Sequence, residues 1–336
     1  MTPKKQEAAI KAFWTWWAKS RSKFEAAIST GEFGSLPDAA AKHVAAIDDA
    51  LQWEMGSGLR AEHFLALSPN GSARVRKVSE RWRAAAPPET KTWEYWPARP
   101  PRPDATLTYA EHPMRLDECS FRWTHDKVHE VFDVEIHHPS FPRMSKDDRE
   151  SAAVLLLDGA LGEDDVERWI GTIEPTKKAP AAGRSFASFV KALQKLAASA
   201  TGGVLVTLEG TDAHERPLEI VYNAALKRID HLHLDLHVTI TLQLLRPTSS
   251  GLASAAEARA LQSLEDALEE SLGESAALLG HETNRGKRVI HLFAAESSDA
   301  ADVIARWSEE HRNYKPRSKT ERDEEWDAAC QWNAGD

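Results

Sequence analysis

The sequence has very little cysteine. Only Cys119 and Cys330 occur among 336 residues, far apart and with no second pair at the CxxC or zinc-ligand spacing. This scarcity argues against a disulfide framework and a cysteine-based zinc site. We expect both side chains to be reduced structural thiols.

A long apolar run is missing near the N-terminus. The segment from Met1 to Glu7 leads straight into an amphipathic pattern, without the hydrophobic stretch that a signal peptide or membrane anchor requires. We therefore predict a cytoplasmic protein that does not enter a membrane.

Familiar catalytic motifs are absent as well. The sequence contains no GxSxG elbow, no HExxH, no Walker loop and no GxGxxG after a strand. We therefore assign no catalytic residue and no cofactor, and we favour a protein that is not an enzyme. An active site built from residues distant in sequence stays open, because acid–base pairs need not be neighbours along the chain.

Positive charge is in deficit. The chain has 42 Lys and Arg residues against 52 Asp and Glu residues, which gives a net charge of −10. A surface of that sign repels phosphate backbones and anionic lipids, so general nucleic-acid binding is not expected. The composition is otherwise that of an ordinary globular protein, with 42% hydrophobic and 28% charged residues.

Length and proline content predict a division into modules. A chain of this length is long for one compact core, and the proline-rich segment 97–103 can sustain neither a helix nor a central strand. We predict an α+β protein of tandem modules, each an antiparallel sheet with helices. The modules are a tryptophan-rich one at 1–103, a middle one at 104–228 and a C-terminal one at 229–336.

Hydrophobic periodicity predicts the elements of the first two modules. The first helix has an apolar face made of Ile10, Phe13, Trp14, Trp17, Phe24 and Ile28. Further helices are predicted near 36–51, 72–83, 146–157 and 186–196. Strands are predicted at 93–96, on both sides of a turn at 124–127, at 204–208 and at 218–222. The segment 166–173 fits a helix almost equally well, and we interpret it as a strand.

The last third has the clearest pattern. Apolar residues alternate from Leu232 to Leu244, and the capping box 254–257 opens a helix that buries Leu261, Leu264, Leu268 and Leu272. Strands at 276–279 and 289–293, a helix around 303–307 and a final strand near Tyr314 complete the order β-α-β-β-α-β. This order is typical of a ferredoxin-like fold.

Short motifs in this region resemble DUF695, a bacterial family of unknown function. They are Glu265-Asp266, Gly280-His281-Glu282-Thr283, Gly286-Lys287-Arg288 and Asp323-Glu324-Glu325-Trp326. The resemblance covers about 235–330, and Glu324 stands where the family usually has proline. It implies a fold like that of the ribonuclease E inhibitor (RraB-like), and the family has no established activity.

One candidate metal site follows from strand alternation. In the segment 231–237, alternation places His231, His233, Asp235 and His237 on one face of a strand. Imidazole and carboxylate at this spacing can share a divalent metal. A solvated face opposite inward leucines is the simpler interpretation, and we prefer it.

A second predicted strand repeats this pattern. His129, Asp133, Glu135 and His137 share the face opposite Phe132, Val134 and Ile136. If the two polar faces met, they would form one mixed site that titrates near neutral pH. The sequence does not indicate whether they meet.

Two features suggest a partner surface in the first module. The helix 72–83 carries a local charge of +4 and could bind an acidic partner or phosphates, although an ordinary solvated helix face is the simpler explanation. Its basic residues are Arg74, Arg76, Lys77, Arg81 and Arg83, against Glu80. We prefer the solvated face, because any surface helix displays charges opposite an apolar row such as Val75, Val78 and Trp82. Trp16 falls off the buried stripe of its helix, and indoles are favoured at interfaces.

These patterns favour a non-catalytic protein-binding or regulatory protein whose partner is an unidentified protein. One alternative is a metal-binding protein or hydrolytic enzyme that uses the two His and carboxylate strands. Another alternative is a self-associating structural protein, a homodimer formed through its tryptophan-rich N-terminal helix.

Overall fold

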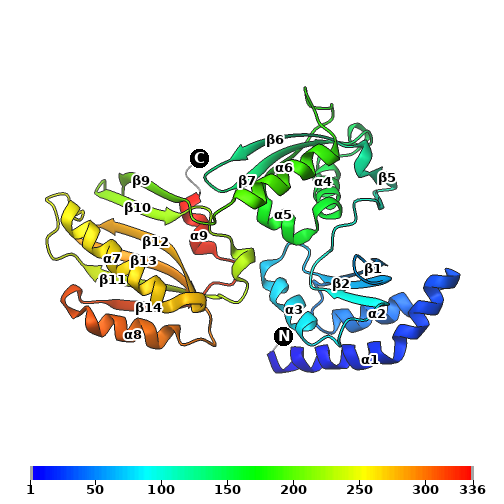
Figure 1. Cartoon of the computed structure of the whole chain (residues 1–336), viewed down its shortest axis with the longest axis horizontal. Coiled ribbons are helices and arrows are strands. Elements are labelled where there is room, and N and C mark those ends of the chain that lie inside the picture. Colours follow the sequence, from blue (N-terminus) through cyan, green and yellow to red (C-terminus); the bar gives the residue numbers. More distant parts are fainter. Residues whose placement is uncertain (1–2, 334–336) are drawn as a thin grey trace. The chain divides into compact units, whose positions relative to one another are not determined.

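The computed structural model describes residues 3–333, which divide into two compact units (Figure 1). Unit 1 comprises residues 1–125 and 131–197, and unit 2 comprises residues 126–130 and 198–336. These bounds differ from the division into three modules. The proline-rich segment 97–103 lies inside unit 1, and residues 198–228 fall in unit 2 with the C-terminal elements.

The first part of unit 1 contains a small mixed sheet and three helices. Strands β1 and β2 are antiparallel, and β3 lies parallel to β2, so the order is β1-β2-β3. The elements are α1 (Pro3–Thr30), α2 (Leu36–Ala45), β1 (Gln52–Ser57), β2 (His63–Ser68), α3 (Ala73–Ala84) and β3 (Trp93–Trp96).

The apolar face predicted for α1 is confirmed. Phe13, Trp17 and Phe24 are at most 1% exposed and pack in one core with side chains of α2, β2, α3 and β3. Two indole N–H groups in this core have acceptors, since Trp14 Nε1 donates to the Trp82 carbonyl and Trp17 Nε1 donates to the Tyr95 hydroxyl.

The second part of unit 1 has a separate core. Its sheet has the order β6-β7-β8, and β8 is parallel to β7. The elements are β4 (Thr106–Tyr109), β5 (His112–Arg115), β6 (Ser120–Asp126), β7 (Val131–His137), α4 (Lys146–Leu161), α5 (Glu163–Trp169), β8 (Ile170–Pro175) and α6 (Phe186–Ser199). Both parts of unit 1 thus follow one plan, two neighbouring strands, a helical connection and a third strand parallel to the second.

Two local predictions in this part were wrong. The turn expected at 124–127 lies at 127–130, since β6 continues to Asp126. The segment 166–173 is divided between the end of α5 and the start of β8, so each of the two competing periodicities describes half of it.

Unit 2 is built on one six-stranded sheet of order β14-β11-β13-β12-β10-β9, and every pair of neighbours is antiparallel. The elements are β9 (Leu205–Thr211), β10 (Pro217–Asn223), β11 (Leu236–Gln243), α7 (Ala255–Leu272), β12 (Ala276–Asn284), β13 (Lys287–Ala294), α8 (Ala300–Glu310), β14 (Arg317–Arg322) and α9 (Asp327–Asn333). The predicted chain order from β11 to β14 is confirmed, whereas the ferredoxin-like fold stays a prediction because β10 and β9 extend the sheet.

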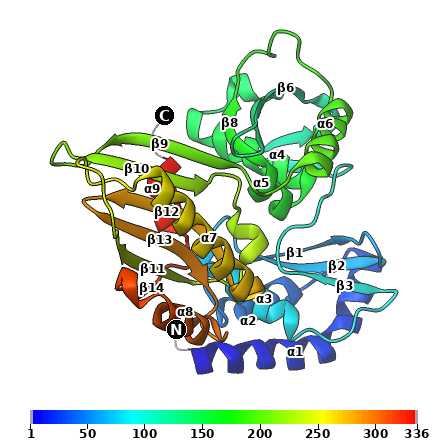
Figure 2. The same cartoon turned by 60° about the vertical axis from the view of Figure 1, so that its left-hand side comes forward.

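Helices cover the two faces of this sheet unequally (Figure 2). Side chains of α7 and α8 pack with Val238, Ile240, Ile290 and Leu292 on one face. On the other face Trp326 and Trp332, just before and within α9, pack with Tyr222 and Phe293. Each face of the sheet therefore has its own apolar core.

Among residues 3–333 we find no helix whose length and hydropathy would suit it to cross a lipid bilayer. The structure is α+β, as predicted.

Candidate functional site

The four residues of the first predicted metal site do not share a strand face. The strand begins at Leu236, and His231 ends a short 3-10 helix (Arg228–His231). The alternation therefore does not apply to residues 231–235. The ring of His231 stacks against Trp326, and His233 Nε2 lies 3.0 Å from the Glu274 carbonyl oxygen.

The other two residues of that set have separate partners. Asp235 accepts a hydrogen bond from Arg322 of 3.1 Å. His237 stacks on His291, and its Nε2 lies 3.1 Å from Nδ1 of that ring. Burial lowers the pKa of His237, and burial together with the two neighbouring imidazoles lowers the pKa of His291 to about 4. This pair is neutral at physiological pH.

The second set lies on and near β7. Asp133, Glu135 and His137 alternate with the buried Phe132, Val134 and Ile136, as predicted, whereas His129 lies in the preceding turn. Asp133 accepts hydrogen bonds from the Thr172 backbone and hydroxyl, and Glu135 pairs with Arg122. His137 Nδ1 lies 2.9 Å from the Thr176 carbonyl oxygen, and His129 Nδ1 lies 2.6 Å from Asp126.

Each of these eight side chains has its own neighbour. Within residues 3–333 no three His, Cys, Asp or Glu side chains lie close enough together to hold a metal ion. The metal-site hypothesis therefore has no geometric support in either strand.

The basic residues of α3 are largely engaged in contacts inside unit 1. Arg76 is 3% exposed, donates to the Pro97 carbonyl oxygen and pairs with Asp164 and Glu80. Arg74 pairs with Asp48, Arg81 donates to Gln6, and Arg83 pairs with Glu89, while Lys77 is half-buried. These ion pairs reduce the positive field that the sequence suggested.

Trp16 is half-buried rather than fully presented to solvent. Its ring stacks on His43 at 4.5 Å between centroids and contacts Phe13 and Phe24 edge-on.

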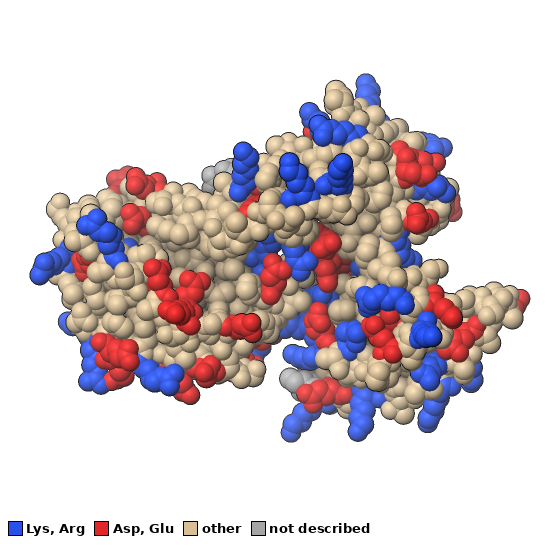
Figure 3. All heavy atoms as spheres, in the orientation of Figure 1, with Lys and Arg blue, Asp and Glu red and all other residues tan. Residues whose placement is uncertain are grey.

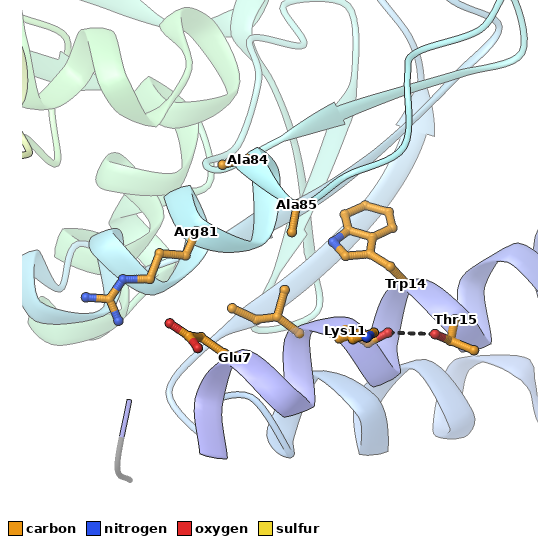
Figure 4. A pocket seen from close by; sticks show the side chains of 8 residues that line it. Glu7, Lys11, Trp14, Thr15, Arg81, Ala84 and Ala85 are labelled. Atoms are coloured by element: carbon orange, nitrogen blue, oxygen red, sulfur yellow. Dashed lines mark hydrogen bonds between the residues drawn. The ribbon is translucent and has the colours of Figure 1, made fainter. Parts of the chain in front are cut away.

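A groove of about 730 Å³ lies between α1 and α3 (Figure 4). Ile10, Trp14, Ala84 and Ala85 give it an apolar floor, and charges of both signs, Glu7, Lys11 and Arg81, line it.

Unit 2 holds a buried ionic cluster that sequence reasoning missed. Glu265 of α7 lies 2.7 Å from Nδ1 of His281 in β12, and its second oxygen accepts from Arg288 of β13 at 3.1 Å. Arg288 also donates to the Thr283 hydroxyl at 3.1 Å. All four residues are at most 4% exposed, so the carboxylate is balanced inside the protein rather than by water.

A groove of about 270 Å³ lies beside this cluster. It separates α7 from the uncovered ends of β9 and β10, and His281 lies in its wall. Leu205, Val221 and Leu279 give it apolar surface, whereas Asp266 and Glu269 supply charge. Burial, followed by the nearby Asp266, raises the pKa of Glu269, so a cation in the groove would relieve the carboxylate repulsion. Figure 3 shows acidic side chains gathered on α7.

The wall of this groove depends on one glycine. Gly280 has φ of +152°, and a Cβ atom there would lie 2.2 Å from the Val221 carbonyl oxygen. Only glycine allows β10 to lie this close to the bulge in β12 between Leu278 and Gly280.

The two edges of the sheet differ in protection. Strand β14 carries Arg317, Lys319 and Arg322, with all six residues exposed. Charges of this kind discourage the pairing of an edge strand with a foreign strand. Strand β9 has one charged residue, Glu209, while Leu205 is 68% exposed and Leu208 is 38% exposed. The β9 edge therefore lacks the charges that protect β14.

Residues 213–331 match DUF695, a family of unknown function. Four of the motif residues, Glu265, His281, Thr283 and Arg288, form the buried cluster, so the resemblance rests partly on the interior of the DUF695 region. No curated protein and no solved structure matches the chain. The bacterial origin and the likeness to the ribonuclease E inhibitor stay predictions.

Proposed function

We propose that this chain is a non-catalytic binding protein, and that unit 2 binds a basic, extended segment of a protein partner along β9. The observation that carries the proposal is the exposed leucine edge of β9 beside the acidic groove of α7. A peptide that adds to a sheet edge gains main-chain hydrogen bonds, and alternate side chains supply specificity.

The charges beside β9 favour a basic partner. The strand register places Glu209 opposite Glu219, on the same face of the sheet as Leu205 and Val221, which line the groove. Neither β9 nor β10 contains a lysine or arginine. Together with Asp266 and Glu269 of α7, this surface presents carboxylates to any strand that lies along it.

The same charges disfavour a second copy of the chain as the occupant. Two β9 strands paired with each other would bring their Glu209 side chains near one another, and each chain has a net charge of −10. A basic segment meets no such repulsion.

A cytoplasmic location is part of the proposal. The thiols of Cys119 and Cys330 are both free, and that of Cys330 is exposed. A reducing compartment preserves such a thiol.

Peptide titration tests the proposed binding. We expect the labelled peptide KVKVTVK to bind the full chain, measured by fluorescence anisotropy, and to bind less well at high salt, whereas EVEVTVE does not bind. The Leu205→Lys, Leu208→Lys double variant, which gives β9 the charges of a protected edge, should weaken binding by about tenfold or more.

A matched control separates the edge from general charge effects. Leu245 is 51% exposed in the same unit but lies outside β9, so Leu245→Lys should leave the affinity unchanged. Equal loss in both variants would contradict the proposal. Sedimentation that reveals a homodimer, lost only in the double variant, would assign the edge to a second copy and overturn the basic partner.

A further inference from the structure

Unit 1 contains a half-enclosed cavity of about 230 Å³ that no sequence motif indicated. Its wall combines β1, the segment 97–103, the β4–β5 hairpin and α4. The charged groups that line it are Glu54, Arg99, Arg102 and Asp158. Leu107, Met114 and Leu155 supply the apolar part of the lining.

The absence of a side chain at Gly159 keeps this space open. A Cβ atom there would lie 3.1 Å from Leu107 Cδ1, so a larger residue would push into the apolar part of the lining. The cavity therefore has the composition of a small-molecule site, apolar surface with a few convergent polar groups.

The two arginines in the wall differ in how many of their N–H groups have hydrogen-bond acceptors. Arg99 donates to Glu54 at 2.7 Å, to Asp158 at 3.2 Å and to Asn70 at 3.0 Å. Arg102 donates to Glu54 through Nη2 at 2.8 Å, while its buried Nε has no hydrogen-bond acceptor among residues 3–333. A buried donor without an acceptor carries a desolvation penalty. The Arg102 side chain as a whole is 27% exposed, so a ligand oxygen can approach its guanidinium group.

Asp158 makes the charge of the cavity dependent on pH. Burial, followed by the nearby Glu163, raises the pKa of Asp158 to about 7, against the lowering effect of Arg99, and Glu54 raises it further. Arg102 and the Tyr109 side chain also line the cavity. When Asp158 is protonated, the lining charges are Arg99 and Arg102 against Glu54, which leaves one positive charge.

We propose that this cavity binds a small monocarboxylate, whose oxygens accept hydrogen bonds from Arg102 while its apolar part packs against Leu107, Met114 and Leu155. An anion there favours the protonated form of Asp158, so binding takes up a proton. The affinity for the monocarboxylate is therefore highest below neutral pH and falls as the pH rises through the pKa of Asp158.

Calorimetric titration of the full chain with benzoate tests this site, with benzamide as the uncharged analogue of the same shape. We expect benzoate to bind, benzamide to bind at least about tenfold more weakly, and the benzoate affinity to fall by about tenfold between pH 6 and pH 8.5. Failure of benzoate to bind at pH 6, or equal binding of the two compounds, would overturn the proposal.

Three variants assign the effect to residues. Arg102→Gln should weaken benzoate binding by about tenfold or more. Asp158→Asn should retain binding but remove its dependence on pH. Arg115→Gln, an exposed arginine paired with Asp117 outside the cavity, should change neither. If Arg102→Gln fails to fold, Arg102→Lys serves, since it keeps the charge but loses the planar donor. An unchanged affinity in the folded Arg102 variant refutes the site.

Discussion

Unit 1 and unit 2 each bury a carboxylate beside arginine, but the two carboxylates are balanced differently. Glu265 has His281 on one oxygen and Arg288 on the other, within a cluster whose residues are at most 4% exposed. Asp158 shares Arg99 with Glu54 and lies near Glu163, so negative groups crowd one guanidinium. Glu265, with a basic side chain on each oxygen, stabilises the fold as an ion pair, whereas Asp158, which shares one arginine with other carboxylates, titrates near neutral pH.

Removing the carboxylate in unit 2 should have the largest effect on stability. Glu265→Gln leaves Arg288, which is 1% exposed, without its anion, and an uncompensated buried charge costs about 3–5 kcal/mol. Urea unfolding at pH 7 measures this loss. The adjacent, exposed Asp266 provides the control, and Asp266→Asn should change the unfolding free energy by less than about 0.5 kcal/mol. Similar losses of unfolding free energy in the two variants would show that the buried cluster does not stabilise the fold.

Removing the carboxylate in unit 1 should instead change how stability depends on pH. The pKa of Asp158 is about 7 in the folded chain and has an ordinary value of 3.8. Its protonated form therefore favours folding, a contribution that is complete below pH 3.8 and lost as the pH rises through 7.

Comparison of wild type with Asp158→Asn isolates this contribution. Between pH 4.5 and pH 8 the unfolding free energy of wild type should fall relative to the variant by about 2 kcal/mol, roughly half of what the full shift allows. Urea unfolding at several pH values measures the difference. A constant difference across this range would contradict the assignment.

Unit 2 should respond to pH in the opposite sense through His291. Its pKa is about 4 in the folded chain, below the ordinary 6.5, so its neutral form favours folding. This contribution is present above pH 6.5 and is lost as the pH falls towards 4. Relative to His291→Phe, wild type should lose about 1–2 kcal/mol between pH 7.5 and pH 4.5. Thermal unfolding across this range measures it, and a gain of stability on acidification would refute it.

The two edges of the sheet should differ least in stability and most in solution behaviour. Because Leu205 and Leu208 are exposed, Leu205→Lys, Leu208→Lys should change the unfolding free energy by less than about 0.5 kcal/mol. The same variant should reduce light scattering of concentrated samples, since lysines protect an edge strand. Adding a leucine to the other edge with Lys319→Leu should increase scattering. No change in either variant would remove the contrast between the edges.

The sequence predicted elements better than it predicted contacts. The apolar rows of α1 and α7 are regular at the helical period, so both helices were found with their buried faces. The alternation in 231–235 was misleading, because the backbone turns before Leu236 and periodicity alone does not register a turn. The segment 97–103 reads as a linker from its prolines, yet Arg99 and Arg102 hold it against β1 and α4.

One feature of the sequence could have indicated the buried cluster of unit 2. Glu265 occupies the buried row of α7 between Leu261 and Leu268, and a charged residue in an apolar row implies a buried partner. Its partners are more than 15 positions away along the chain on β12 and β13. No local pattern identifies them, because strand register, which brings His281 and Arg288 to the same face, is set by the whole sheet.

The strand order of unit 2 also determines when it can form. The sheet β1-β2-β3 can pair once Trp96 has been synthesised, whereas β10 needs β12 and β11 needs β14 at the far end of the chain. Pairing over such sequence separation is slow and exposes strands while they wait. The β9–β10 hairpin can therefore complete its pairing only after β12 has been synthesised, and the free edge of β10 remains open to other strands until then.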